Sequence, residues 1–330
     1  MNRIISFGLR LDYAKLISAP LTGLLFFVCA QMVQAERLNG SPRDRLSGTL
    51  RTAHFVVSYE PSDPFLAKLL ADTAEDELRR ISSDLGYSPE KNRPFKLYVF
   101  TTHTDFIRAG GLETSKFTVG TTSLGSDEIM VDASGTFDLP ERILAHEITH
   151  AVVFRMLGFL ATEMPLWMHE GLAKYESRES STYDEEMVAT AAAEGSLIPL
   201  SHLHNAFPRS NTGLAYAESA AAVKFLIARY GPEIPRRLLK ELIRTHSMDA
   251  AMIATTGQTI SEFEKEWFRA VSKRYRGLRM VRLGTTLVSV MMATLAVVAY
   301  LKRRKEQVLE PSYDETCPAS EDSKTENCTQ

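Results

Sequence analysis

The sequence predicts an α+β fold in which a strand-rich part precedes a helical part and a membrane-spanning helix follows. β-Type runs are confined to residues 50–135, whereas residues 138–278 have helical periodicity almost throughout. Such segregation of strands and helices along the chain is typical of α+β proteins. Residues 283–301 carry no charged side chain and are long enough to cross a bilayer. With 330 residues, 44% hydrophobic composition and a net charge of −3, the chain gives no sign of binding nucleic acid.

Residues 1–35 are predicted to be a signal peptide or an N-terminal signal anchor. An apolar stretch from Leu16 to Val33 follows a net-basic leader, and small residues at Val33 and Ala35 suit cleavage before Glu36. The apolar stretch is long for a signal core, so its retention as an anchor is the alternative. In either case the segment exports the part of the chain that follows.

The strand-rich part is predicted to alternate strands with two helices. Apolar residues recur at helical spacing from Phe65 to Leu85, and Gly86 then supplies a helix stop. The other elements expected here are a strand at 52–59, a strand at 95–100, a short helix from 105 to 109, and one or two strands within 114–133.

The helical part is predicted to begin with a metal-binding helix. His146 and His150 are the two histidines of an H-E-x-x-H sequence, inside a helical pattern that begins near Pro140 and ends at Gly158. Positions i and i+4 lie on one helix face, so both imidazoles can bind a single metal ion. Glu147 is then placed to act as the general base on water activated by that metal.

A third ligand is expected downstream, because catalytic zinc usually has three protein ligands and one open position. Glu170 lies within the apolar stretch Pro165–Ala173. Burying its carboxylate without a partner is unfavourable, and a metal ion would remove that cost. His169 is the alternative third ligand, although one helical step of about 100° separates it from Glu170.

H-E-I-T-H followed by W-M-H-E-G-L-A resembles the gluzincin metallopeptidases, and among them the bacterial peptidase-MA-like domains. The resemblance covers roughly residues 53–275. It implies that residues 36–280 form a thermolysin-like zincin domain, with a small mixed sheet and a metal-binding helix, followed by a mostly helical part. It also implies one Zn²⁺ ion held by His146, His150 and Glu170. The G-x-M-E-N signature of the gluzincin aminopeptidases is absent, which favours an endopeptidase.

The resemblance further suggests a residue that stabilises negative charge on the substrate. Gluzincins often use a phenol or an imidazole from a later helix for the oxyanion of the tetrahedral intermediate. Tyr216, in the A-Y-A-E-S sequence that opens a later predicted helix, has that position. Aromatic residues at helix starts are more often packing residues, so His202, His204 and Tyr175 remain alternatives.

The C-terminal region is predicted to anchor the protein. Residues 283–301 form the expected transmembrane helix, with a buried core helix as the alternative. Residues 302–330 begin with the basic cluster K-R-R-K, which disfavours translocation, and continue as an acidic tail whose composition predicts disorder. Together with the export segment, this arrangement places the metal site outside the cytoplasm and the tail inside.

The sequence therefore predicts a membrane-anchored zinc metallopeptidase that hydrolyses peptide or protein substrates. Ile129–Val131 is expected to be the sheet edge to which an extended peptide adds as a strand. A non-catalytic, metal-binding, membrane-tethered module is the alternative, although such a module would not need Glu147. An intramembrane protease is disfavoured, because Glu141, Arg142 and Arg155 interrupt the helix that carries the motif.

Overall fold

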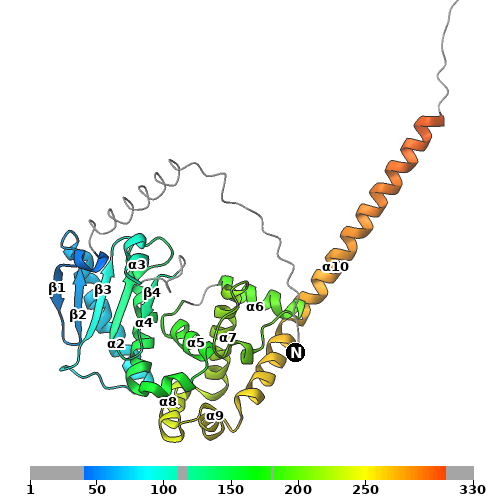
Figure 1. Cartoon of the computed structure of the whole chain (residues 1–330). Helices are drawn as coiled ribbons and strands as arrows, with labels where there is room; N and C mark the ends of the chain where they lie inside the picture. Colours follow the sequence, from blue (N-terminus) through cyan, green and yellow to red (C-terminus); the bar gives the residue numbers. More distant parts are fainter. Residues whose placement is uncertain (1–40, 111–117, 180–181, 310–330) are drawn as a thin grey trace, which may run out of the picture. The chain divides into compact units, whose positions relative to one another are not determined.

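The computed structural model describes residues 41–110, 118–179 and 182–309 (Figure 1). The predicted export segment, residues 1–35, and the acidic tail beyond residue 309 lie outside the described residues. The chain divides into two compact units, Met1–Val271 and Ser272–Gln330.

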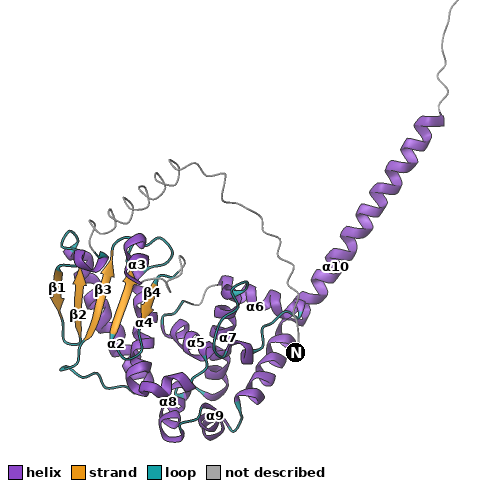
Figure 2. Cartoon of the chain, viewed as in Figure 1, coloured by secondary structure: helices purple, strands orange, loops and turns teal. Residues whose placement is uncertain are grey.

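The first unit contains every strand found among the described residues and all but the end of the helical part (Figure 2). Its elements in chain order are η1 (Pro42–Arg45), β1 (Gly48–Arg51), β2 (Phe55–Tyr59), α2 (Pro64–Leu85), β3 (Phe95–Phe100), α3 (His103–Gly110), β4 (Gly120–Thr122), β5 (Glu128–Asp132), α4 (Pro140–Leu157), η2 (Gly158–Glu163), α5 (Leu166–Glu176), α6 (Thr182–Glu194), η3 (Leu200–Leu203), α7 (Thr212–Tyr230), α8 (Ile234–Thr245), α9 (Met248–Thr256) and the start of α10 (Ile260–Leu309). The predicted α+β organisation is confirmed.

The strands form one mixed sheet in the order β1-β2-β3-β5-β4. β2, β3 and β5 run parallel to one another, whereas β1 and β4 pair antiparallel at the two edges. The prediction that Ile129–Val131 forms the sheet edge is wrong, because β5 lies between β3 and β4. The chain turns back after β4, so the strand that comes earlier in sequence occupies the edge.

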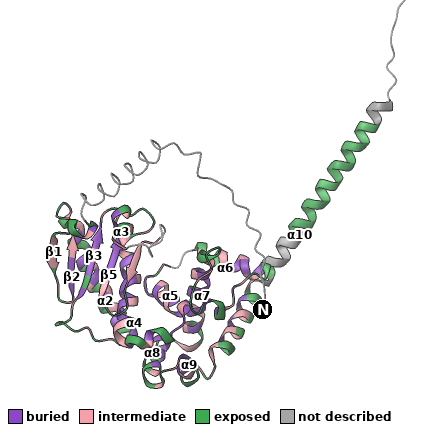
Figure 3. Ribbon diagram, in the orientation of Figure 1, coloured by how far each residue is buried: buried purple, intermediate pink, exposed green. Residues whose placement is uncertain are grey.

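Helices α2 and α4 pack against each other and against the sheet, α2 on β2 and α4 on β4 and β5. α2 begins at Pro64, where the Asp63 side chain accepts a hydrogen bond from the Leu66 amide, and it ends at Gly86 with φ of 76°. Its buried residues recur at helical spacing and face the core. α4 is buried on most sides, as Figure 3 shows. The core of the first unit therefore lies between the sheet and these two helices.

The helical part packs on the other side of α4, with α5 against α7 as its most intimate contact. Gly171 of α5 makes this approach possible, since a Cβ atom there would lie 2.3 Å from the Ser219 carbonyl oxygen of α7. Trp167 of α5 stacks on Phe263 at 6.0 Å between ring centroids, and both side chains are fully buried. This contact joins α5 to the first turn of α10.

Helix α10 continues into the second unit. Its segment Thr285–Lys305 has a mean hydropathy of 1.6 and none of it is buried, so it is long and apolar enough to cross a membrane. Residues 285–301 of the predicted span are therefore exposed. The segment Pro140–Glu163 passes the same test of length and hydropathy, but 56% of it is buried, as expected for the core helix of a folded domain.

Candidate metal centre

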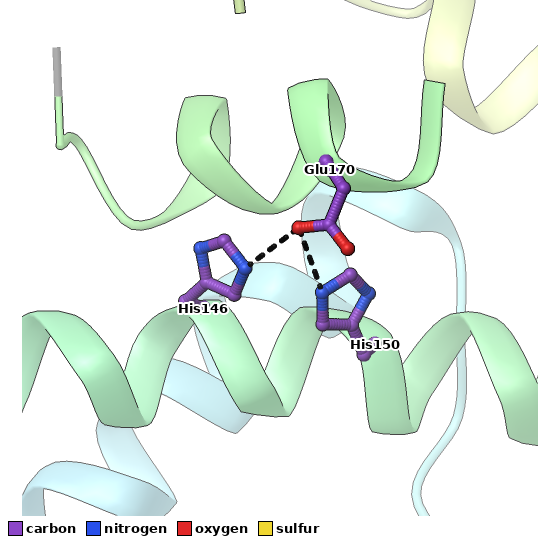
Figure 4. Close-up of side chains that lie close together, drawn as sticks. All are labelled: His146, His150 and Glu170. Carbon is purple, nitrogen blue, oxygen red and sulfur yellow. Dashed lines mark hydrogen bonds and ion pairs between the residues drawn. The ribbon is translucent and has the colours of Figure 1, made fainter. Parts of the chain in front are cut away.

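Helix α4 places His146 and His150 side by side. Pro140 occupies its first turn and Gly158, with φ of 54°, ends it, so both histidines lie well inside a regular helix. Their ring centroids are 4.9 Å apart, and both rings face α5 (Figure 4). The i, i+4 spacing thus gives two imidazoles that point to a common position.

The turn η2 and helix α5 bring Glu170 opposite these histidines. Glu170 Oε2 lies 3.3 Å from His146 Nε2 and 3.6 Å from His150 Nε2. The ligand atoms of the three residues all lie within 4.8 Å of one another, and this His-His-Glu cluster could hold a metal ion. Gly171 lets α5 pack directly on α7, and this contact supports α5 in the position that brings Glu170 to the two histidines.

The two separations that involve Glu170 are those of side chains that share one metal ion. Bonds of about 2.1 Å at tetrahedral angles would place neighbouring ligand atoms about 3.4 Å apart, and the two observed separations from Glu170 Oε2, 3.3 and 3.6 Å, lie on either side of that value. The longer one exceeds ordinary hydrogen-bond length. Two nitrogens and one carboxylate oxygen with an open fourth position are also a donor set found in catalytic zinc sites.

Glu179 contacts the His146 ring on the side opposite Glu170. Its Oε1 is 3.1 Å from His146 Nδ1, the ring nitrogen that does not face Glu170. Burial opposes the charged forms of these groups, but Glu170 and Glu179 raise the pKa of His146, and His146 in turn lowers the pKa of Glu179. Burial likewise opposes ionisation of Glu170, yet His150 and His146 hold the pKa of this carboxyl far below its usual value. Glu179 therefore orients the His146 ring, with Nε2 left for the metal position.

We expect Glu179→Gln to lower zinc affinity by about 10- to 100-fold without unfolding the chain, because carboxylates that orient metal-bound histidines contribute on that scale. A zinc titration against a fluorescent chelator would measure the change. Glu185→Gln, at an exposed position in α6, is the matched control. Equal affinities for the two variants would remove Glu179 from the site.

Glu147 points from α4 to the edge strand β4. Thr122 Oγ1 donates a hydrogen bond of 2.6 Å to Glu147 Oε2. A Cβ atom on Gly120 would lie 2.5 Å from Glu147 Oε1, so only glycine allows the strand to pass so close. Burial raises the pKa of Glu147, partly offset by His150 and His146. The raised pKa makes the Glu147 carboxylate a stronger base. This carboxylate lies close enough to His146 and His150 to interact with both electrostatically.

His169 is not part of the three-residue cluster, although its ring centroid lies 6.2 Å from that of His150. Its Nε2 lies 2.9 Å from the Ala161 carbonyl oxygen in η2, and its ring packs against Phe154 at 5.7 Å between centroids. Burial lowers the pKa of His169 to about 4, so the ring is neutral near pH 7 and Nε2–H can donate to that carbonyl. The contact fastens the start of α5 to η2 and thereby helps to position Glu170.

Tyr216 lies in the first turns of α7, and the carboxylates at the cluster affect the pKa of its phenol. Burial raises the pKa of its phenol, and Glu170, Glu147 and Glu179 raise it further. Its ring packs edge-on against Phe207 at 4.9 Å between centroids. Of the alternatives, His202 and His204 are exposed and Tyr175 is half-buried. Tyr216 is thus electrostatically coupled to three carboxylates at the cluster.

The sequence interpretation missed Glu179, Thr122 and Gly120. Glu179 follows the end of α5 in a polar stretch, so its only sequence signal is an acidic residue shortly after the third expected ligand. Gly120 and Thr122 alternate on one face of β4, a pattern visible in G-T-T, but the pairing of that strand with α4 depends on contacts distant in sequence.

Comparison with known proteins identifies similar sequences. The family model described as the peptidase MA superfamily matches residues 73–273, a range that contains the whole cluster. The uncharacterized protein YhcO of Bacillus subtilis (strain 168) is 25% identical over 149 residues, which are 42% of this chain. The aligned part spans 44% of YhcO, less than half of that protein's length.

Proposed function

Because the chain belongs to the peptidase MA superfamily, we propose that it is a zinc-dependent metallopeptidase of the gluzincin type that cleaves internal peptide bonds. The observation that supports this most is the His146, His150 and Glu170 cluster directly beside the buried carboxylate of Glu147. A purely structural metal site has no need of a base at that place.

In the proposed reaction, His146, His150 and Glu170 would hold the ion, which would supply Lewis-acid chemistry by lowering the pKa of water and polarising a carbonyl group. Glu147 takes the proton of the attacking water and then delivers it to the leaving amine. The hydrogen bond from Thr122 keeps the Glu147 carboxylate in place between these two transfers. Both tasks require a carboxyl group that can change its protonation state, and burial moves the pKa of Glu147 in the required direction.

The substrate peptide would bind along β4, whose outer edge has no strand partner among the described residues. An extended peptide added there as a further strand passes directly over Glu147, since Gly120 and Thr122 both contact that side chain. Tyr216 is the proposed stabiliser of the oxyanion. Its raised pKa keeps the phenol protonated near neutral pH, so it can donate a hydrogen bond to developing negative charge.

Removing metal with a chelator should abolish peptide hydrolysis by the purified full-length protein in detergent, and added Zn²⁺ should restore it. Metal content should rise to about one ion per chain, because the cluster offers one set of three ligands. A quenched fluorescent peptide library gives the rate, and elemental analysis gives the content. Hydrolysis that persists in fully metal-free protein would contradict the proposal. A chain that binds zinc but cleaves nothing would favour the metal-binding module.

We further propose that the protein is anchored in a membrane through the exposed apolar segment Thr285–Lys305, with the metal centre outside the cytoplasm. The length and hydropathy of this segment support a span. The N-terminal apolar stretch supports export, and the basic cluster at residues 302–305 supports retention of the C-terminal end inside.

A reporter enzyme that works only outside the cytoplasm should be active when fused after Tyr275 and silent when fused after Lys305. The reason is that translocation of the K-R-R-K cluster opposes the positive-inside rule. Deletion of residues 1–35 should silence the first fusion as well. If the fusion after Tyr275 is silent in the intact chain while the fusion after Lys305 is active, the assigned orientation is reversed.

A further inference from the structure

A cavity of about 240 Å³ lies next to the metal centre, between the β4–β5 turn and the C-terminal half of α4. Leu124 and Gly125 of the turn form one wall, Ala151 and Phe154 of α4 form another, and Phe159 of η2 stands at the end of the helix. All of these residues belong to the first unit. The function proposed above assigns no role to this cavity.

The cavity begins where the proposed peptide-binding edge ends. Thr122 lines it and also holds the Glu147 carboxylate at 2.6 Å. Ala151 lies one helical turn after Glu147 on the same face of α4. A substrate bound in front of Glu147 would therefore reach the cavity with the side chain of a residue very close to the cleaved bond.

The direction of β4 determines whether the side chain that enters the cavity belongs to a residue before or after the cleaved bond. A peptide that pairs antiparallel with β4, the more stable arrangement per residue, runs opposite to the Gly120-to-Thr122 direction. Its residues on the amino-terminal side of the cleaved bond then lie beside Thr122 and Leu124, at the cavity mouth. Because alternate side chains of a strand point to the same face, one of the two residues preceding the cleaved bond points toward α4 and the cavity.

The walls indicate the chemistry of the side chain that would fit. Phe159 is 90% exposed and Leu124 is 39% exposed, although both are apolar and border the cavity. The charged residues of the cavity are paired with one another, since Asp127 Oδ1 lies 2.9 Å from Arg155 Nε and its Oδ2 lies 2.8 Å from Arg93 Nε. The exposed apolar side chains of Leu124 and Phe159 are therefore the main surface that the cavity offers to a ligand, beside the hydroxyl groups of Thr122 and Ser123.

We propose, resting on the proposed function, that this cavity is the subsite for a large apolar side chain within two residues on the amino-terminal side of the cleaved bond. An acidic side chain is the competing occupant, because Arg155 Nη2 is buried without a hydrogen-bond partner among the described residues. The guanidinium of Arg155 is covered by the Phe95 ring, 3.3 Å from its centroid, and is already paired with Asp127. These contacts favour the apolar occupant.

Cleavage-site mapping on a proteome-derived peptide library tests the subsite. Full-length protein with Zn²⁺ should cut preferentially after sequences with Phe or Leu at one of the two preceding positions. Leu124→Asp and Phe159→Asp should each reduce that preference by about tenfold, the scale of losing a few apolar contacts. Phe65→Asp, at a 79% exposed position on α2 outside the cavity, should leave it unchanged. Cuts also made by Glu147→Gln are subtracted as contamination. Preference for Asp or Glu, or for residues only after the cleaved bond, would overturn the assignment.

A binding measurement separates failure of the subsite from failure of the peptidase proposal. Zinc-loaded protein should bind acetyl-Phe-Phe-hydroxamate more tightly than acetyl-Ala-Ala-hydroxamate, and Leu124→Asp should narrow the difference while Phe65→Asp should not. If these affinity differences are found but no peptide is hydrolysed, the subsite is supported and the proposed peptidase activity is contradicted. Equal affinities, or no binding of either compound to the zinc-loaded chain, would overturn the subsite whatever the hydrolysis shows.

Discussion

Glu147→Gln should bind zinc as the wild-type chain does and lose peptide hydrolysis by about three orders of magnitude, within the range that general acid–base groups contribute. The amide keeps the size of the side chain and an oxygen that can accept the Thr122 hydrogen bond, so β4 and α4 should keep their contact. It cannot accept a proton from water near neutral pH. The loss should therefore fall on kcat, with little change in KM.

Glu141→Gln is the matched control for this experiment, because it removes a carboxylate from the first turn of the same helix without touching the cluster. Metal content, thermal unfolding and steady-state rates should be measured on both variants. Unchanged hydrolysis in Glu147→Gln would remove Glu147 from the reaction, and loss of zinc from it would assign the carboxylate a role in binding.

Glu170→Ala should lose most of its zinc, and so should His146→Ala and His150→Ala. The affinity should fall by more than about 100-fold, beyond the range found for residues that only orient ligands. In the Glu170 variant, two histidines remain and the carboxylate that faces both of them at 3.3 and 3.6 Å is gone. Equilibrium dialysis against Zn²⁺ measures the loss.

His169→Ala is the informative companion variant, since His169 was the competing third ligand in the sequence. Its Nε2 is engaged by the Ala161 carbonyl oxygen, so its replacement should loosen η2 and lower thermal stability while most of the zinc is retained. Full zinc in Glu170→Ala together with loss in His169→Ala would transfer the third-ligand role to the histidine.

Local patterns predicted the elements that depend on neighbours in sequence. Phe95–Phe100 is the predicted strand, α2 ends at Gly86 as expected, and α4 extends from Pro140 to the residue before Gly158. The periodicity of a helix also places His146 and His150 together without further information. Glu170 could be singled out because a carboxylate in an apolar stretch needs a partner.

Long-range pairing could not be predicted in the same way. The sheet order depends on which strands meet in space, and proximity to the metal helix in sequence wrongly suggested β5 as the edge. β1 was not expected as a strand, since its residues are alternately half-buried and exposed at the sheet edge and G-T-L-R has little apolar content. The contact of Glu179 with His146 crosses from the end of α5 back to α4, and no sequence pattern marks it.

The close approach at Gly171 has a mechanical consequence. With no side chain between them at this point, α5 and α7 form one packed pair that carries Glu170 and Tyr216, whereas α4 carries His146, His150 and Glu147. A displacement of this pair from α4 would therefore move the Glu170 carboxylate away from the two imidazoles. An ion bound by all three side chains would hold α4 against the α5–α7 pair, because it binds the packed arrangement and favours it by mass action. Metal binding and the packing of α4 against this helical pair would then stabilise each other.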